Sequence, residues 1–292
     1  MSVAISRRVW FAAALAGVGG CARWVTTSDD EPSVLPPARM SPDSVVLELA
    51  FVRLAASDQA AWDSIWTEAD EQHFPPELRK QLSANGLRQG ILGQQLPSKL
   101  REALDSAAEQ VLEERAEDVS SNDTEVSRGQ RRLQCRTGRR AKIVVTKTFP
   151  RLPLLTLEDG QIRGNDLREA QGLLALKPYP LGDGRVRLEI TPEVEHGEMK
   201  TQWVGQESSL MQRLGRERLV FDRLRSSATI AGGQVLVIST TSEVKGLGEH
   251  FFSETAGGTT ERTLLLLRVA QTQLDHLFAP EQMPAPLATP AD

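Results

Sequence analysis

The chain has 292 residues, of which 40% are hydrophobic and 25% are charged, and its formal net charge is −5. This length predicts roughly two domains with a sizeable core in at least one, and 22 glycines with 16 prolines are too few for a collagen-like or low-complexity chain. The negative net charge and the aromatic content of 5% argue against a nucleic-acid partner, because nucleic acids attract basic surfaces and stack on aromatic rings.

The first twenty residues have the pattern of an export signal. Arg7 and Arg8 precede the apolar run 9–20, which ends in small residues and is about half as long as the ~20 residues that a membrane-spanning helix needs. We therefore expect residues 1–20 to be a signal peptide. Ser6-Arg7-Arg8 also resembles a twin-arginine signal, so both general secretion and twin-arginine export remain open.

Cys21 follows this run directly, and the segment 18–21 (VGGC) resembles a bacterial lipobox. The resemblance implies cleavage before Cys21 and acylation of its thiol and its new amino group, and several acyl chains hold a protein stably on a bilayer. An ordinary signal peptide with an incidental cysteine is the alternative. Residues 21–40 are polar and contain a Pro-Pro pair, as in an extended tether. Ala22 stands where lipoproteins kept in the inner membrane often carry Asp, which favours the outer membrane or the cell surface.

Strand and helix patterns alternate over residues 41–116. Ser57 or Asp58 is a suitable N-cap for the first helix, and Asn85-Gly86 a suitable C-cap for the second. In chain order we expect a strand over 45–52, a helix ending before Pro75, a helix over 77–84, a strand over 87–92 and a helix from Pro97 to about Ala116. This order is typical of a small αβ domain whose helices cover one face of a sheet.

A polar linker is expected over 117–129, and a mainly β domain over 130–275. The polar stretch 206–224 is compatible with a helix. The expected strands cover 132–136, 141–146, 152–157, 172–176, 186–190, 226–230, 235–239 and 263–270. The tail 276–292 is rich in Ala and Pro, and we expect it to be disordered. The predicted fold class is therefore α+β, with a small αβ domain before a mainly β domain.

Four segments of the region 130–275 follow one another in an order that is known from a protein family. They are an apolar segment with a Gly-Asp-Gly turn and a Pro-Glu-Val end (172–194), a strand–Gly-Gly–strand unit (225–238), a Leu-Gly…Phe-Phe loop (246–252) and a last apolar strand (264–269). Together they resemble the C-terminal domain of secretins. The resemblance implies an envelope protein in which 41–116 stands where secretins carry small periplasmic αβ modules. The whole chain also looks like lipoproteins of planctomycete type.

A secretin subunit crosses the bilayer with a hairpin of amphipathic strands, which here would fall between Thr146 and Gly172. Pro153 interrupts the first strand, and Arg163 and Asp166 are expected on opposite faces of the second. Because an Arg facing lipid costs about 2–4 kcal/mol at mid-membrane, we expect a secretin-like domain that forms no pore.

No catalytic, metal or cofactor site is predicted. Cys135 has arginines nearby that could lower its pKa, but no histidine is near it in sequence, and a lone strand cysteine is more often an apolar filler. The basic cluster around it could bind an anion, although such a run is more often a solvated strand face. Carboxylates neighbour a histidine at 70–73 and 193–198, but neither place has the spacing of a zinc site.

The sequence thus favours a protein that is not an enzyme, anchored to a membrane through Cys21, with a structural or assembly role in the cell envelope. Its partners would be copies of itself or an envelope complex, bound through sheet edges, and no nucleic acid. The alternative is an envelope hydrolase or a small-ligand-binding protein.

Overall fold

A computed structural model describes residues 43–117, 130–206 and 209–273 of the chain. The expected signal peptide, the tether with Cys21, the linker apart from its first residue and the tail 276–292 lie outside the described residues.

The described residues form a mainly β structure with few helices, which confirms the predicted α+β class. The helices are α2 (Gln59–Glu68), α3 (Pro76–Ala84), α4 (Ser98–Glu117) and α5 (Gly246–Phe252), with a 3-10 turn η1 at Asp222–Leu224. The strands are β1 (Ser44–Ala55), β2 (Leu87–Leu92), β3 (Gln130–Arg136), β4 (Ala141–Val144), β5 (Phe149–Glu158), β6 (Gln161–Pro180), β7 (Val186–Gln206), β8 (Ser209–Val220), β9 (Ser226–Ile230), β10 (Val235–Thr240), β11 (Ser253–Ala256) and β12 (Thr259–Gln273).

The strands make two antiparallel sheets. The first sheet has the order β2-β10-β12-β1-β3, with β11 pairing β12. The second has the order β4-β6-β7-β8, with β5 pairing β6 and β9 pairing β7.

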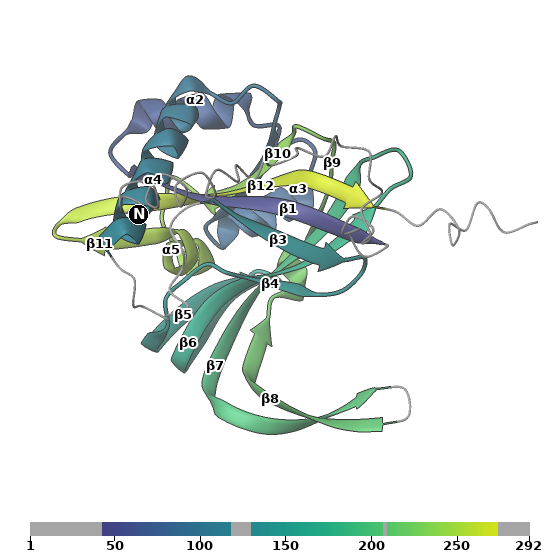
Figure 1. Ribbon diagram of the computed structural model, residues 1–292. Coiled ribbons are helices and arrows are strands. Elements are labelled where there is room, and N and C mark those ends of the chain that lie inside the picture. The colour runs from purple at the N-terminus through teal and green to yellow at the C-terminus, as the bar shows by residue number, and fades with distance from the viewer. Residues whose placement is uncertain (1–42, 118–129, 207–208, 274–292) are drawn as a thin grey trace, which may run out of the picture. The chain divides into compact units, whose positions relative to one another are not determined.

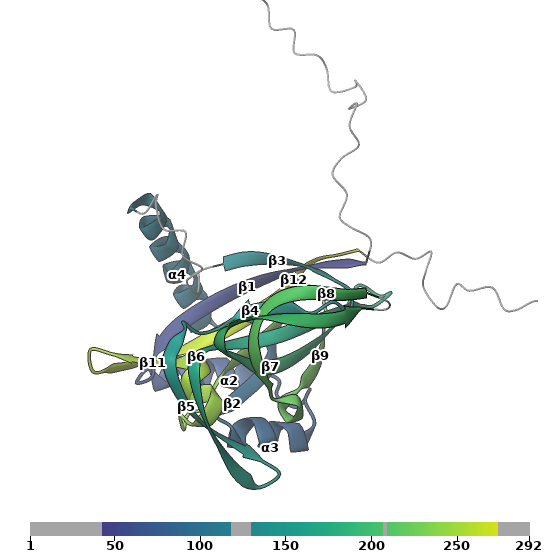
Figure 2. The same ribbon diagram turned by 90° about the horizontal axis from the view of Figure 1, so that it is seen from below.

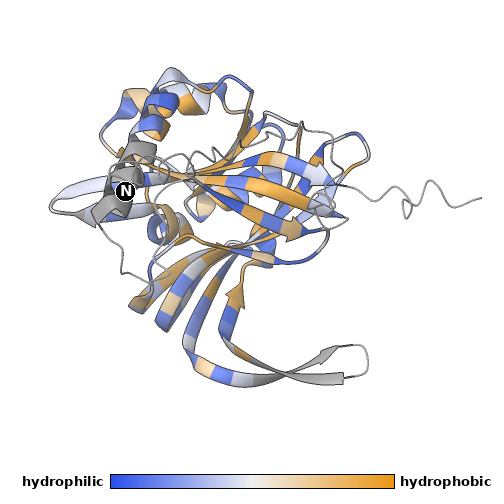
Figure 3. Cartoon of the chain, viewed as in Figure 1, coloured by the Kyte–Doolittle hydropathy of each residue, from blue (hydrophilic) through white to orange (hydrophobic). Residues whose placement is uncertain are grey.

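The two faces of β1 explain why the structure has three layers, namely helices, the first sheet and the second sheet. Leu47 and Leu49 point to one face, where they join a buried cluster with apolar residues of the second sheet. Ala50 and Val52 point to the other face and pack with Trp62 of α2. Side chains alternate between the two faces of a strand, and both faces of β1 are apolar, so the first sheet lies between α2 and α4 on one side and the second sheet on the other (Figure 1). Apolar residues accordingly concentrate along the strands of the first sheet (Figure 3).

The expected separation into domains over 41–116 and 130–275 is corrected by the structure. All described residues belong to one compact unit that begins at Met40. β1 lies between β12 and β3, and β2 pairs with β10. A strand that is apolar on both faces needs neighbours on both edges, and the first region supplies only one other strand. The partners therefore come from the second region: β3 at its start, and β10 and β12 near its end.

Local signals placed most elements correctly, and several segments differ. β6 already begins at Gln161 and β7 runs on to Gln206, whereas strands are expected only over 172–176 and 186–190. Asp58 caps α2 as expected, because its carboxylate accepts a hydrogen bond from the Ala61 N–H at 3.1 Å. The stretch 206–224, which is compatible with a helix, forms β8 and η1 instead, since pairing with β7 overrides its local preference. The expected loop at 246–252 is helix α5, whose Leu247, Phe251 and Phe252 are buried.

Candidate functional site

The second sheet divides into two ribbons. β6 and β7 pair only from Gln171↔Glu195 to Pro180↔Val186. Beyond Gln171 the first half of β6 pairs with β5 alone, and beyond Glu195 the second half of β7 pairs with β8 alone. The β5–β6 ribbon extends beside α3, and the β7–β8 ribbon curves away from it (Figures 1 and 2).

The backbone bends where the ribbons part. Glu169 of β6 has a φ of 48°, a left-handed conformation that is uncommon for residues other than glycine. In β7, Gly197 has a φ of 74°, and the register with β8 shifts between His196 and Lys200. Arg216 Nη1 of β8 donates a hydrogen bond to the Glu169 carbonyl at 3.2 Å, which ties the second ribbon to the base of the first.

Each ribbon exposes large apolar side chains. On the β5–β6 ribbon, Leu155 is 62% exposed and Ile162 is 75% exposed. Leu154, on the opposite face of β5, is buried in the core. On the β7–β8 ribbon, Met199 and Leu214 are 59% and 60% exposed. These four residues and Val220 are the large apolar residues that stand out as exposed in the described part of the chain. The four lie on the ribbons, and Val220 lies at the base of the second one, opposite Glu193.

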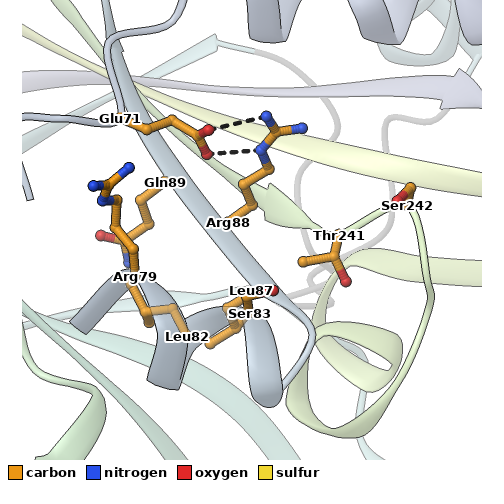
Figure 4. A pocket seen from close by; sticks show the side chains of 9 residues that line it. All are labelled: Glu71, Arg79, Leu82, Ser83, Leu87, Arg88, Gln89, Thr241 and Ser242. Atoms are coloured by element: carbon orange, nitrogen blue, oxygen red, sulfur yellow. Dashed lines mark hydrogen bonds and ion pairs between the residues drawn. The ribbon is translucent and has the colours of Figure 1, made fainter. Parts of the chain in front are cut away.

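A pocket of about 280 Å³ lies at the edge of the first sheet, between α3, β2 and the segment after β10 (Figure 4). Its lining residues are Glu71, Arg79, Leu82, Ser83, Leu87, Arg88, Gln89, Thr241 and Ser242. Gly86 holds these segments together: its φ of 75° turns the chain from α3 into β2, and its carbonyl accepts a hydrogen bond from the Thr241 N–H at 2.9 Å.

The charges of the pocket lie in two groups. Arg88 forms a bidentate ion pair with Glu71, at 2.7 Å from Nε to Oε1 and 3.0 Å from Nη2 to Oε2, and its guanidinium lies 4.2 Å from the centre of the Trp66 ring. Arg79 has no ion pair with any residue that the structure describes, and its Nε is buried without a hydrogen-bond partner. Gln89 is 3% exposed, and its Oε1 is also without a partner.

Cys135 lies on β3 opposite Val45 of β1 and is 4% exposed. Burial raises the pKa of its thiol from 9.0 to about 11. The idea that neighbouring arginines lower this pKa is therefore wrong, because desolvation disfavours the thiolate. The side chain occupies a packed, apolar position.

Glutamates pair with three cations of the basic cluster near Cys135. Arg132 pairs with Glu48 at 3.2 Å. Further ion pairs join Arg140 to Glu193 and Lys142 to Glu195. Glu193 and Glu195 belong to the segment 193–198 of β7. Their carboxylates therefore pair with cations at the start of β4, on the other side of β6.

The other carboxylate–histidine segment, 70–73, has a structural role as well. His73 Nε2 accepts a hydrogen bond from the Thr229 N–H at 3.2 Å. Within the described ranges, no group of three or more His, Cys, Asp and Glu side chains is arranged to hold a metal ion. Sequence reasoning missed Arg79 and Gln89, which share no motif and meet only because α3 folds back beside β2.

No helix in the part of the chain that the structure describes is long and apolar enough to cross a membrane. Comparison with protein-family models, with curated proteins and with solved structures finds no match for this chain.

Proposed function

We propose that this chain is a lipid-anchored, secretin-like protein of the outer membrane or cell surface that has a structural or assembly role and forms no pore. The observation that carries the assembly role is the pair of diverging ribbons with exposed apolar side chains. Cys21 would hold the protein on the membrane, and the ribbons would contact copies of the chain or an envelope complex.

The ribbons have two properties of a contact surface. Exposed apolar side chains gain free energy when a partner covers them, and here they cluster on two projecting elements rather than being scattered. In addition, no described strand pairs with the edge of β6 that faces away from β5 over residues 161–170. An edge of this kind offers unpaired N–H and C=O groups to a further strand.

The β5–β6 ribbon also has a firm base, which suits a docking element. Leu152 and Leu154 anchor one face of β5 in the core, so the opposite face with Leu155 is presented in a fixed orientation. Arg151 and Asp166 form an ion pair at 2.8 Å across the ribbon. A partner would meet an apolar tip flanked by balanced charge.

The test replaces the apolar tip. A chain with Leu155→Asp and Ile162→Asp should lose its association with envelope partners or with itself, because a charge at each site cannot be buried without a counter-ion. Chemical cross-linking in envelopes and sedimentation of the purified protein measure this association. Ala270→Asp, at another exposed strand position, is the matched control. A wild-type protein that is monomeric and free of partners, or a double variant that associates normally, would overturn the proposal.

The anchor is tested separately. Cys21→Ala should abolish palmitate labelling and release the protein from membranes, because the thiol is the acyl acceptor. Uptake of labelled palmitate by the variant, or a wild-type protein that takes up none, would show that the lipobox interpretation is wrong.

The absence of a pore has its own measurement. β6 places Arg163 opposite Thr156 of the buried face and Asp166 opposite Pro153 of the exposed face, so charges lie on both faces of the ribbon. We expect no conductance when the protein without residues 1–21 is added to planar bilayers. Stable single-channel steps would contradict this expectation.

A small-ligand-binding role is the second candidate, and the pocket beside α3 favours it. The pocket lining contains serine and threonine hydroxyls but no histidine, and its carboxylate, Glu71, is held by Arg88. This set of groups suits binding better than hydrolysis.

A further inference from the structure

The pocket beside α3 carries an unbalanced positive charge. Its one carboxylate, Glu71, is fully engaged by the two nitrogens of Arg88. That leaves Arg79 as an additional cation in the lining, with no acidic partner among the residues described. A guanidinium that lines a pocket without a counter-ion is a binding group for an oxyanion, since its N–H donors match two oxygen atoms at once.

Gln89 adds a second, independent observation. The residue lines the pocket and is 3% exposed, and its Oε1 is buried and accepts no hydrogen bond from any described group. Buried polar atoms of folded proteins are nearly always hydrogen-bonded. An amide oxygen can only accept, so the partner that it requires is a donor. Arg79 and Gln89 lie on one side of the pocket, and Thr241 and Ser242 on the other (Figure 4).

These groups are fixed in place by the fold. Gln89 belongs to β2, where it pairs with Ile238 of β10. Arg79 lies on α3, whose end is joined to β2 by Gly86, and the Gly86 carbonyl holds Thr241. The donors and acceptors are therefore positioned by helix and strand backbones, which lowers the entropic cost of binding.

We propose that this pocket binds a small oxyanion that carries a hydroxyl donor next to its charge, such as an α-hydroxy carboxylate or a protonated phosphate. The anionic oxygens accept hydrogen bonds from the Arg79 guanidinium, and the hydroxyl of the ligand donates to Gln89 Oε1. The hydroxyls of Ser83, Thr241 and Ser242 line the rest of the site. This inference is independent of the assembly role, because the ribbon residues do not line the pocket.

Titration calorimetry of the purified full chain with three probes tests the proposal. Glycolate has a carboxylate and an adjacent hydroxyl, acetate has the carboxylate alone, and inorganic phosphate has both an anionic oxygen and a hydroxyl. We expect saturable binding of glycolate or phosphate, and acetate binding about tenfold weaker than glycolate, because the hydroxyl bond to Gln89 is lost. The tighter of glycolate and phosphate identifies the source of the oxyanion. No saturable binding of any probe, or equal binding of acetate and glycolate with no binding of phosphate, would overturn the proposal.

Two variants separate the roles of the binding groups. Arg79→Gln should weaken every probe that binds by about tenfold or more, because it removes the charge. Gln89→Leu should weaken glycolate to the level of acetate and leave acetate unchanged. Lys80→Gln removes an exposed cation one residue from Arg79, outside the lining, and should change nothing.

An equal loss of affinity in Lys80→Gln and Arg79→Gln, or unchanged affinity in Arg79→Gln, would contradict a specific site at Arg79. Circular dichroism and thermal unfolding show whether the variants are folded. If a variant does not fold, the comparison of acetate with glycolate and phosphate on the wild-type chain decides the outcome.

Discussion

Gly86 joins three segments that are far apart in the chain. Its φ of 75° is left-handed, and a Cβ added there would overlap the carbonyl oxygen of Lys245, just before α5. The same constraint acts from the other side, since a Cβ on Gly248 would overlap the Gly86 carbonyl. Two glycines thus allow the turn between α3 and β2 to pack directly on the start of α5.

Gly86→Ala should therefore lower the free energy of unfolding by about 3 kcal/mol, through left-handed strain and a steric overlap that the backbone cannot relieve. Urea denaturation measures the change. Gly93→Ala is the control, because Gly93 has open space around its Cα and no positive φ. Similar stability in the two variants would show that the close approach of α5 is not needed.

The buried thiol of Cys135 makes the free energy of unfolding depend on pH. The buried thiol has its pKa raised from 9.0 to about 11, so the folded state binds the proton more tightly than the unfolded state does. Its contribution is complete below about pH 9 and is lost as the pH rises toward 11.

Cys135→Ala should remove this dependence. Relative to the variant, the wild type should lose about 2 kcal/mol of unfolding free energy between pH 8 and pH 10.5. Urea unfolding of both proteins at the two pH values measures the difference. A constant difference would mean that the thiol is not desolvated, and rapid reaction with a thiol reagent at pH 8 would show the same.

At the scale of elements, the side chain of Asn85 makes the backbone hydrogen bonds to β5 that a neighbouring strand would make. Its side chain is 1% exposed and makes two hydrogen bonds to the backbone of Leu157 in β5: Leu157 N–H to Oδ1 at 2.8 Å, and Nδ2 to the Leu157 carbonyl at 3.0 Å. Nδ2 also donates to Gln81 O at 3.0 Å. These bonds satisfy the edge of β5 at Leu157 and connect the ribbon to the end of α3.

Asn85→Ala should cost about 3 kcal/mol, because it leaves the N–H and C=O of Leu157 without these partners in a partly buried position. The loss should be accompanied by faster hydrogen exchange of the β5–β6 ribbon. Asn165→Ala, on the same ribbon and without a side-chain hydrogen bond among the described residues, is the control and should change little. Exchange that rises equally throughout the protein would argue against a local role for Asn85.

At the scale of the whole molecule, the order of the first sheet ties the beginning of the described chain to its end. β1 runs between β12 and β3, with Leu49 opposite both Leu267 and Arg131. Removing β1 would leave the facing edges of β12 and β3 without hydrogen-bond partners. The β-rich region cannot complete its core without the first strand.

A chain limited to residues 130–275 should consequently show no cooperative unfolding in urea, whereas residues 40–275 should unfold in one sharp transition. Circular dichroism during urea titration measures both. A cooperative transition of the shorter chain, with retained near-ultraviolet signal, would mean that two independent domains exist after all.

Structure that depends on residues close in sequence could be predicted, and structure that depends on contacts between distant segments could not. Asp58 marks the start of α2 because an N-cap acts within three residues. The stretch 206–224 has no such signal, and its strand exists because β7 lies beside it. The sequence likewise did not indicate that Arg79 and Gln89 line one pocket, because only the packing of α3 beside β2 brings them together.

The sequence by itself determined the α+β class, the helices α2 to α4, most strands and the apolar character of Cys135, because periodicity, capping and turn residues act over short distances. Only the tertiary structure decided which strands pair, that 41–116 and 130–275 share one sheet, and that the second sheet divides into two ribbons. Strands pair through backbone N–H and C=O groups, which are nearly the same at every residue and so do not specify the partner strand. The choice of partner therefore depends on how all apolar faces are buried at once.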